Sequence, residues 1–467
     1  MKHFFALLGA LLLAFGGRAQ SFPVDTLVKT GPLNQRINLV FLSDGYQASE
    51  LNQFRTDVDQ IVAELFNQTP FREYRPYFNV FAVRVPSVQS GASHPRTASD
   101  CGASTLPTGS VNNYFGSAFD QGGIHRLVVP TRMATVMSVL ARNLPQYDQA
   151  FVVVNTPEYG GSGGTLATSS THPSAKEIGI HEVGHSFAGL ADEYWAGPQY
   201  ARERPNMTQQ TNPLLVKWAA WMNTNGVGIY PHTGDASWKK PHQGCKMQQL
   251  GVPFCSVCRE TFVERIHTLA LPLQSFTPSP PVVNGPSQDV NLTLNLLHPA
   301  APSPLRVVWK RGSTVVARNV AQLTVALGSL PLGLTRIQAE ITDTTALTRS
   351  ASHLTQHTYA VTWDVNRTVT GTRTTAAAYE YRLETYPNPV AAELNLSYTL
   401  SRALPVEITV LDDAGRKLKT PLRRSAQRAG THEYRFSAAE LGLRRPGRYL
   451  LVLDIDGNRV TRPLVRE

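Results

Sequence analysis

The chain has 467 residues, 42% of them hydrophobic and 17% charged, a composition typical of a globular protein with roughly two to four domains. Its net charge of +10 could indicate nucleic-acid binding. About half of that excess lies after Tyr386, on scattered arginines that form no long basic tract. We therefore expect no nucleic-acid partner.

The N-terminus has the features of a secretory signal peptide, residues 1–19. Lys2 supplies a positive charge before an apolar run at 4–15, which is too short for a comfortable transmembrane span. Small residues at Gly17 and Ala19 predict cleavage before Gln20. No later segment is apolar enough to cross a bilayer, so we expect an exported mature chain without a transmembrane segment.

Strand and helix patterns alternate along the first half of the chain. Apolar residues recur at helical spacing over 51–66, and a last helix is expected at 261–271. Buried strands are expected at 36–42, 78–85, 126–130 and 149–155. This alternation predicts a layered α/β or α+β domain over residues 20–272.

The most informative stretch is the H-E-x-x-H pattern from His181 to His185. Residues four apart lie on the same face of a helix, so His181 and His185 can bind one metal ion together. Glu182 is rotated by about 100° and borders that ion without having to ligate it. The pattern is that of a zinc hydrolase, with one catalytic Zn²⁺ on the two imidazoles and Glu182 as the general base for a water molecule.

The helix that carries this motif has both ends marked in the sequence. Ser174 and Glu177 have the spacing of a capping box, and Gly189 is placed to end the helix. Apolar residues at 180, 183, 187 and 190 form a stripe that predicts packing against a core.

A tetrahedral zinc site needs one more protein ligand, and Asp192 is the first candidate. On a continuous helix Asp192 would lie about 10 Å beyond His185, so the chain must turn back at Gly189. This resembles the metzincin pattern, in which a residue three after the glycine completes the site, although the interval from His185 to Gly189 is one residue longer here. Glu193 is the alternative third ligand, and a more distant carboxylate such as Glu203 is a further one.

Three of the four cysteines, and one methionine between them, lie near the end of this domain, while Cys101 lies near its middle. In an exported chain, disulfides among Cys101, Cys245, Cys255 and Cys258 are favoured over a four-cysteine metal site, and three pairings are open. Met247 is the candidate for a methionine turn beneath the metal, with an ordinary core methionine as the other interpretation.

In the second half of the chain the apolar period changes to two, which is typical of strands. Strands expected at 290–296, 305–310, 322–327, 335–341 and 357–363 predict an immunoglobulin-like β-sandwich over 280–366. A linker rich in Thr, Ala and Gly at 367–383 precedes a last block, 384–467. Strands expected there at 393–400, 406–411, 432–436 and 447–453 predict a second small all-β sandwich.

Several short motifs that resemble those of a known family occur, in the family's order, over roughly half of the chain. They are FLSDGY at 41–46, FNV at 78–80, SGASHP at 90–95, YGGSG at 159–163, HEVGHSFAGLADEY at 181–194, CKM at 245–247 and FCSVCRE at 254–260. In these motifs the chain resembles the IgA-peptidase family of bacterial zinc metallo-endopeptidases. The resemblance implies a zincin-like catalytic domain, one catalytic zinc ion, and a protein or peptide substrate.

The last block carries a second resemblance. It opens with YPNP at 386–389, has a D-x-x-G turn at 412–415, and contains the strand GRYLLVL at 447–453. In these features it is similar to the C-terminal sorting domain of the type IX (Por) secretion system. That implies the type IX machinery as a partner, and a protein that passes through the periplasm to be secreted or held on the outer-membrane cell surface.

Together these patterns predict a secreted zinc-dependent endopeptidase that hydrolyses peptide bonds of extracellular proteins. Two alternatives are open: a cell-surface binding or adhesion protein on a metallopeptidase scaffold, and a metal-dependent hydrolase with a non-peptide substrate. The intact motif weighs against the first, because a binding protein has no chemical need for Glu182.

Overall fold

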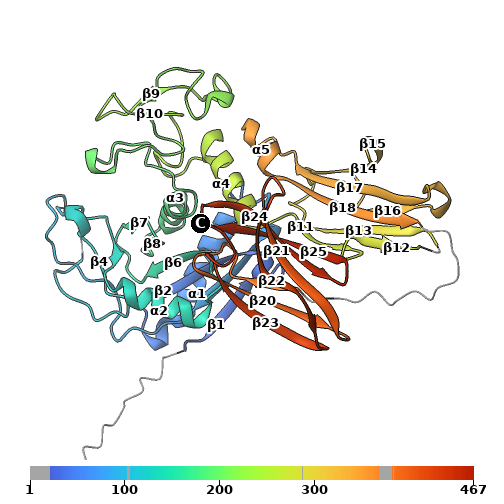
Figure 1. Cartoon of the computed structure of the whole chain (residues 1–467). Helices are drawn as coiled ribbons and strands as arrows, with labels where there is room; N and C mark the ends of the chain where they lie inside the picture. The colour runs from blue at the N-terminus through green and yellow to red at the C-terminus, as the bar shows by residue number, and fades with distance from the viewer. Residues whose placement is uncertain (1–20, 103–105, 287, 368–380, 382, 467) are drawn as a thin grey trace, which may run out of the picture. The chain divides into compact units, whose positions relative to one another are not determined.

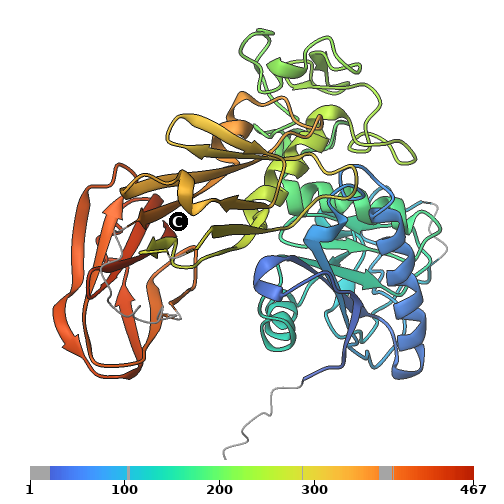
Figure 2. The same cartoon turned by 90° about the vertical axis from the view of Figure 1, so that its right-hand side faces the viewer.

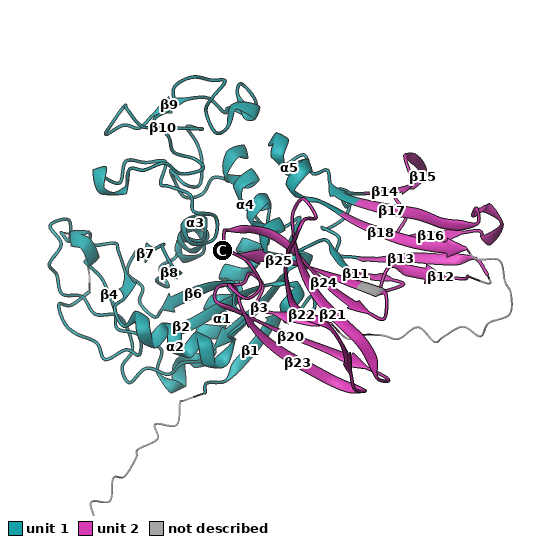
Figure 3. Ribbon diagram, in the orientation of Figure 1, with its two compact units in different colours: residues 1–274, 296–306, 341–359 teal, residues 275–295, 307–340, 360–467 magenta. Residues whose placement is uncertain are grey.

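The computed structural model describes residues 21–102, 106–286, 288–367, 381 and 383–466, and it divides into two compact units (Figure 3). The first unit comprises residues 1–274, 296–306 and 341–359, and the second comprises 275–295, 307–340 and 360–467. The expected signal peptide at 1–19 and most of the expected linker at 367–383 lie outside the described residues. In the described part, no helix combines the length and the apolar character needed to span a membrane.

The first unit is built on a mixed sheet with the strand order β1-β3-β2-β6-β8-β7 (Figure 1). Its strands are β1 (Val24–Val28), β2 (Ile37–Asp44), β3 (Phe78–Val83), β6 (Gln149–Val154), β7 (Gly161–Ser162) and β8 (Ala167–Ser169). The four central strands run parallel, while β1 and β7 pair antiparallel at the two edges. The strands expected at 36–42, 78–85 and 149–155 are confirmed.

Helices cover both faces of this sheet. Successive side chains of β2 point to opposite faces and pack in two different cores. Leu39 and Phe41 belong to the core that includes α1 (Leu51–Leu65) and α3 (Ala175–Ala188). Val40 and Leu42 belong to a second core that includes α2 (Met133–Asn143). A fully buried parallel strand needs apolar residues on both faces, which explains the unbroken apolar run at 39–42 in the middle of β2. The layers can be followed from a second direction in Figure 2.

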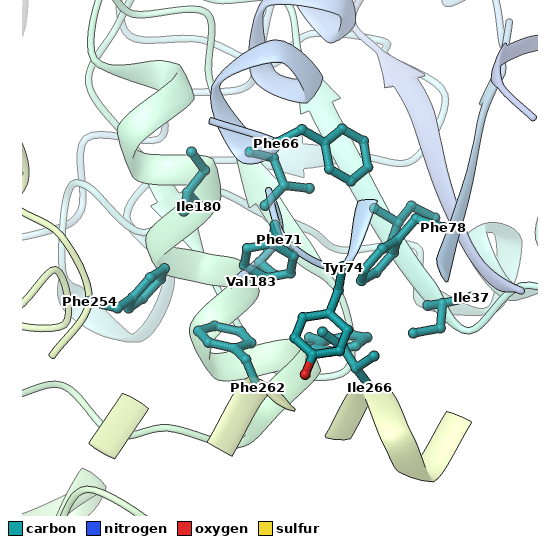
Figure 4. Packing of buried hydrophobic residues seen from close by; sticks show 14 of the residues in the cluster. Ile37, Phe66, Phe71, Tyr74, Phe78, Ile180, Val183, Phe254, Phe262 and Ile266 are labelled. Atoms are coloured by element: carbon teal, nitrogen blue, oxygen red, sulfur yellow. The ribbon is translucent and has the colours of Figure 1, made fainter. Parts of the chain in front are cut away.

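The motif helix α3 packs against α4 (Ser256–Leu269), and buried aromatic side chains fill this contact (Figure 4). The ring of Phe262 on α4 lies 6.2 Å from that of Phe187 and 4.8 Å from that of Phe71. Ile180 and Phe262 are fully buried. Such close packing fixes the helix that must position the two histidines.

Other parts of the first unit depart from expectation. The strand expected at 126–130 is only β5 (Val129–Pro130), paired with β4 (Ser117–Ala118), and the helix expected at 261–271 begins earlier, at Ser256. The helix α2 was not expected at all. The loop-like stretch before α4 contains one short hairpin, β9 (Tyr230–Pro231) and β10 (Lys239–Lys240).

The middle β-region forms two sheets, β11-β13-β16 and β12-β18-β17-β14-β15. Its strands are β11 (Leu273–Thr277), β12 (Val282–Asn284), β13 (Val290–Leu296), β14 (Leu305–Arg311), β15 (Thr314–Arg318), β16 (Gln322–Val325), β17 (Gly333–Asp343) and β18 (Thr358–Arg367). The buried ring of Trp363 on β18 lies 5.7 Å from Phe276 on β11, so an aromatic contact joins the two sheets. The strands at 290–296 and 335–341 are where the period-two pattern predicts them.

Residues 341–359, with the short helix α5 (Ala351–Gln356), belong to the first unit rather than to the second. The buried carboxylate of Asp343 explains this. It accepts a hydrogen bond of 2.5 Å from the Tyr74 hydroxyl and lies 2.8 Å from Nε2 of His267 on α4. The sequence gives no local sign of this exchange, because the partners are more than 70 residues apart.

The C-terminal strands form a three-stranded sheet, β19-β20-β23, and a four-stranded sheet, β22-β21-β24-β25, around one core. They are β19 (Glu384–Tyr386), β20 (Glu393–Leu400), β21 (Leu404–Asp412), β22 (Lys417–Gln427), β23 (Gly430–Ser437), β24 (Gly447–Ile455) and β25 (Asn458–Arg466). Every second residue of β20 is buried, as the alternating pattern predicts. The exposed, Arg- and Lys-rich strand β22 was not expected.

Candidate metal centre

The start of α3 differs from the prediction. Ser174 makes no side-chain capping hydrogen bond, so the expected capping box with Glu177 is wrong. The Glu177 carboxylate instead forms an ion pair with the buried Lys246 and accepts a hydrogen bond of 2.9 Å from the Gly251 amide. Glu177 therefore links α3 to the segment around Lys246, whose backbone carbonyl contacts His181.

The end of α3 is the predicted one. Gly189 has φ of 66°, in the left-handed region that glycine adopts without steric cost. Its amide donates to the carbonyl of His185 at 3.0 Å, and the Leu190 amide donates to that of Gly184 at 3.0 Å. These bonds reverse the chain, so the residues after Gly189 run back toward the motif histidines.

Both motif histidines are oriented by backbone carbonyls. Nδ1 of His181 lies 2.9 Å from the carbonyl oxygen of Lys246, and Nδ1 of His185 lies 2.8 Å from that of Leu190. Each Nδ1–H donates to its carbonyl, so each Nε2 is the atom that faces Asp192 and that can give up its proton to bind a metal ion. The two Nε2 atoms are 3.2 Å apart. This is the tautomer and the convergence that a shared metal ion requires.

Asp192 completes the group. Its Oδ1 lies 3.0 Å from Nε2 of His181 and 3.2 Å from Nε2 of His185. The structure turns Glu193 away, into a buried cluster with cysteines, where its Oε1 lies 3.3 Å from Sγ of Cys258. Glu203 is also elsewhere, since it pairs with Lys217 at 2.5 Å. Of the three candidate carboxylates, only Asp192 meets both histidines.

The charges of this group suit a cation. Burial disfavours the charged imidazole of His185, yet the hydrogen bond and charge of Asp192 raise its pKa to about 9. Burial likewise opposes ionisation of Asp192, but hydrogen bonds from both histidines hold its pKa well below the usual range. The site therefore favours positive charge between one carboxylate and two imidazoles, and these are donors that zinc accepts.

Glu182 lies beside the two histidines, and its carboxylate comes within 4.8 Å of their ring nitrogens. Its Oε2 is 4.0 Å from Nε2 of His185, and burial raises its pKa against the opposing effect of the two histidines. A carboxyl group with a raised pKa is better matched to general-base work near neutral pH. The glycine-rich strand edge covers it closely: a Cβ on Gly163 would lie 2.8 Å from Oε2 of Glu182 and 2.6 Å from Cβ of His185.

A cleft of about 700 Å³ opens over these residues. Its lining includes Glu182, Asp192, Tyr194, Tyr200 and Arg126. The guanidinium of Arg126 lies 5.7 Å from the centre of the Tyr194 ring. Sequence reasoning placed Arg126 only in an expected strand, because an arginine at the start of a short strand carries no local signal of a cleft formed with residues far along the chain.

Met247 lies directly against the motif helix. A Cβ on Gly184 would come within 2.5 Å of its Sδ, so the glycine inside the motif is what admits the methionine. Met247 is fully buried, and its carbonyl accepts a hydrogen bond of 2.7 Å from the amide of Glu193. The methionine therefore supports the helix on one side and the chain that follows Asp192 on the other.

All four cysteines are free thiols in the structure, which does not form the expected disulfides. Cys101 lies apart from the other three, with its Sγ 3.0 Å from Nε2 of His94. The sulfurs of Cys245 and Cys258 are 3.7 Å apart, well beyond a disulfide bond of about 2.05 Å. Cys255 joins them in the buried cluster with Glu193.

Two further groups of His, Cys, Asp and Glu lie close together among the described residues. One combines His94, Cys101, Asp120 and His125, and the other combines Glu264, His353 and His357. In the second, Glu264 is bonded to both histidines, at 2.7 and 2.8 Å. Neither group lines the cleft.

Solved structures give only weak likenesses. Dimeric latent PorU from Porphyromonas gingivalis aligns with a TM-score of 0.18, 12% identity, 40% of this chain and 18% of that chain. A β-glucuronidase from Bacteroides uniformis aligns with a TM-score of 0.18, 11% identity, 49% of this chain and 28% of its own. The fibronectin(III)-like modules of Clostridium thermocellum CbhA align with a TM-score of 0.14, 12% identity, 41% of this chain and 94% of theirs. These scores are too low to carry an argument, and the chain spans less than a third of the first two structures.

The family comparison is more specific. No curated protein matches the chain. A family model described as IgA Peptidase M64 matches residues 26–238, a range that contains the sheet except for the first two residues of β1, the motif helix, Asp192 and both cleft tyrosines. The resemblance seen in the sequence motifs is thereby confirmed for this part of the chain. Residues 26–238, a little under half of the chain, therefore match the IgA peptidase M64 family.

Proposed function

We propose that this protein is a secreted zinc endopeptidase in which His181, His185 and Asp192 hold one catalytic zinc ion and Glu182 is the general base. The observation that carries the proposal is the convergence of two Nε2 atoms on one carboxylate oxygen, at 3.0 and 3.2 Å, at the floor of a cleft. The match to a peptidase family supports a protein substrate.

The residues around the donors divide the remaining chemistry. When bound, zinc would supply Lewis acidity, which polarises the scissile carbonyl and makes a water molecule more acidic. Glu182 is buried on the cleft side of His185, where it takes a proton from the attacking water and returns it to the leaving amine. Lys246 and Leu190 keep the two imidazoles in the required tautomer through their carbonyls.

Two residues are suited to stabilise the negative carbonyl oxygen of the transition state. Burial raises the pKa of Tyr194, so its phenol stays protonated and can donate a hydrogen bond. Its ring stacks on that of His181 at 6.3 Å, which keeps it next to the proposed metal ligands. Arg126 adds a positive charge to the same wall of the cleft.

The substrate backbone would bind along residues 163–165. This exposed segment follows the edge strand β7 and borders the cleft. Gly161 itself is not free to pair, since it bridges to both Ser169 and Leu127. An extended peptide can therefore add to the sheet only beyond Ser162, which brings it past Glu182 and His185.

Export of the chain is the second part of the proposal. The signal-like residues 1–19 would carry it to the periplasm, and residues 384–467 would engage the type IX machinery to reach the cell surface or the medium. The YPNP opening, the D-x-x-G turn and the GRYLLVL strand support this. Fractionation of cells that express the full chain or a chain ending at residue 383 tests it, because only the full chain should cross the outer membrane.

The catalytic proposal is tested with the full chain and a panel of protein substrates. Cleavage should stop with a chelator and return with zinc, and Glu182→Gln should lose activity while zinc content stays unchanged. Glu203→Gln is the matched control, because Glu203 pairs with Lys217 away from the histidines and should keep full activity. Full activity of Glu182→Gln, or wild-type cleavage in excess chelator, would overturn the mechanism. The alternative of a binding protein has no observation in its favour among the described residues.

A further inference from the structure

A second set of metal-type donors lies directly behind Asp192. Glu193, Cys245, Cys255 and Cys258 bring one carboxylate oxygen and three sulfurs within 4.8 Å of one another. All four side chains are buried, with at most 6% of any residue exposed. They come from three segments: the chain after Gly189, the segment with Met247, and the first turn of α4.

The spacing of the donors is that of a tetrahedral site. With Zn–S of about 2.3 Å and Zn–O of about 2.0 Å, neighbouring sulfurs lie about 3.8 Å apart and a sulfur lies about 3.5 Å from an oxygen. The sulfurs of Cys245 and Cys258 are 3.7 Å apart. Oε1 of Glu193 is 3.3 Å from the sulfur of Cys258 and 3.9 Å from that of Cys255.

One atom of this cluster lacks a partner that a cation would supply. Oε2 of Glu193 is buried without any hydrogen bond, while Oε1 receives one from Asn206 at 3.1 Å. An unpaired carboxylate oxygen in the interior is costly, and native proteins resolve it by pairing or by coordination. No donor atom of the other two side groups, around His94 and around Glu264, is a buried ligand left without a partner.

Two features of the surroundings place positive electrostatic potential near the sulfurs. The amide of Cys255 donates to Sγ of Cys245 at 3.3 Å, and Cys255 is the N-cap of α4, so Cys258 lies in the first turn of that helix. The positive end of the helix dipole stabilises negative sulfur there. The buried Lys240 adds a positive charge, with its Nζ 2.8 Å from the carbonyl oxygen of Glu193.

A disulfide explains these contacts less well. The cluster has three cysteines, and Cys101 lies elsewhere against His94. Any one disulfide would leave a third buried thiol beside a carboxylate without a partner. A divalent cation uses all four donors together, and thiolate-rich tetrahedral sites select zinc.

We propose that Glu193, Cys245, Cys255 and Cys258 bind a structural zinc ion, separate from the catalytic one. Four protein donors close the coordination shell, so the ion has no open position for water or substrate. It instead fixes the supports of the catalytic site. Glu193 follows Asp192 in the chain, and the segment from Cys245 to Met247 carries the carbonyl that orients His181.

The test begins with the wild-type full chain, loaded with cobalt under reducing conditions. The cluster should give thiolate-to-cobalt charge-transfer absorption in the near ultraviolet, which histidine and carboxylate ligands do not give. The absorption should persist in His181→Ala/His185→Ala, which removes the proposed catalytic site, and in Cys101→Ser, the matched control outside the cluster. It should vanish in Cys255→Ser/Cys258→Ser, whose zinc content should fall by one ion per chain.

The result does not depend on the folding of the double serine variant, because the wild-type spectrum decides alone. Absence of charge-transfer absorption in the wild-type chain overturns the proposal. A disulfide in the purified native chain also overturns the proposal. It would lower the mass by two hydrogens, and the cluster cysteines would become open to alkylation only after reduction. Either result leaves the catalytic proposal intact, because that proposal is decided by Glu182→Gln and the chelator.

Discussion

Replacement of Gly163 by alanine tests how closely the glycine-rich edge segment must pack against Glu182 and His185. The new Cβ would lie 2.6 Å from Cβ of His185 and 2.8 Å from Oε2 of Glu182. The backbone of Gly163 is not in the left-handed region, so only these contacts oppose alanine. His185 cannot yield, because α3 and its bond to the Leu190 carbonyl hold it. The edge segment must therefore move away by several tenths of an ångström.

The size of the effect follows from the cost of overpacking. An extra methyl group in a tight contact typically costs about 1 to 3 kcal/mol. If that cost falls on the transition state, where the substrate must pair with 163–165 while Glu182 takes its proton, kcat/KM falls by about 5-fold to about 150-fold. Global stability should change little, because residues 163–165 are exposed and free to shift outward.

The assay is kcat/KM on a cleaved protein or peptide, together with zinc content and the unfolding temperature. Gly109→Ala is the matched control, since a Cβ there meets no atom within 4 Å and its backbone suits alanine. Gly161→Ala gives the opposite contrast: its Cβ would lie 2.4 Å from Ile178 in the buried packing of α3, so it should lower the unfolding temperature. Wild-type kcat/KM in a folded, zinc-loaded Gly163→Ala chain would refute the proposed path of the substrate.

Three further predictions follow from the site and its surroundings. Glu182→Gln should lower kcat by about 100-fold to 10,000-fold through loss of the general base, and a smaller loss in a single-turnover assay would contradict that role. Asp192→Asn should weaken zinc binding by at least about tenfold in a competition titration, whereas unchanged affinity would remove Asp192 from the ligand set. Burial opposes ionisation of Glu264, yet hydrogen bonds from His353 and His357 lower its pKa to about 2, below the ordinary value of 4.5. Its stabilising effect, at most about 3 kcal/mol, is therefore complete above pH 4.5 and is lost as the pH falls toward 2. Glu264→Gln should flatten the acid side of the stability curve, and an unchanged slope between pH 5 and pH 3 would contradict the assignment.

What could be read from the sequence is what depends on local spacing. The face shared by His181 and His185 follows from helical geometry, and the chain reversal at Gly189 follows from the reach needed by Asp192. The alternating strands of the second half are visible for the same reason. The strand expected at 126–130 and the capping box failed because tertiary contacts took over, above all the ion pair between Glu177 and Lys246.

The parts that the sequence could not reveal are contacts between distant segments. Arg126 lines the cleft because the tertiary fold brings the loop before β5 next to the motif helix. The transfer of residues 341–359 to the first unit depends on Asp343, which meets Tyr74 and His267 far away in the chain. Neither residue type nor spacing identifies Arg126 or Asp343 in the sequence, because their contacts form only when the tertiary fold brings distant segments together.

The adjacent pair Asp192 and Glu193 shows why the choice of third ligand was open. Both carboxylates follow the turn at Gly189, and spacing alone does not separate them. In the structure they point to opposite sides of one short segment, Asp192 to the histidines and Glu193 to the cysteines. If both sets of donors bind zinc, the segment is anchored from both sides, and a change in one site must be felt in the other. Glu193→Gln, which keeps the size of the side chain and removes its charge, should then lower the zinc affinity of the catalytic site by about 10-fold to 100-fold, as loss of an outer support does elsewhere. The comparison is a zinc titration of the Cys101→Ser chain with and without the Glu193→Gln substitution. Equal zinc affinity of the catalytic site in these two chains would show that the two sites are independent.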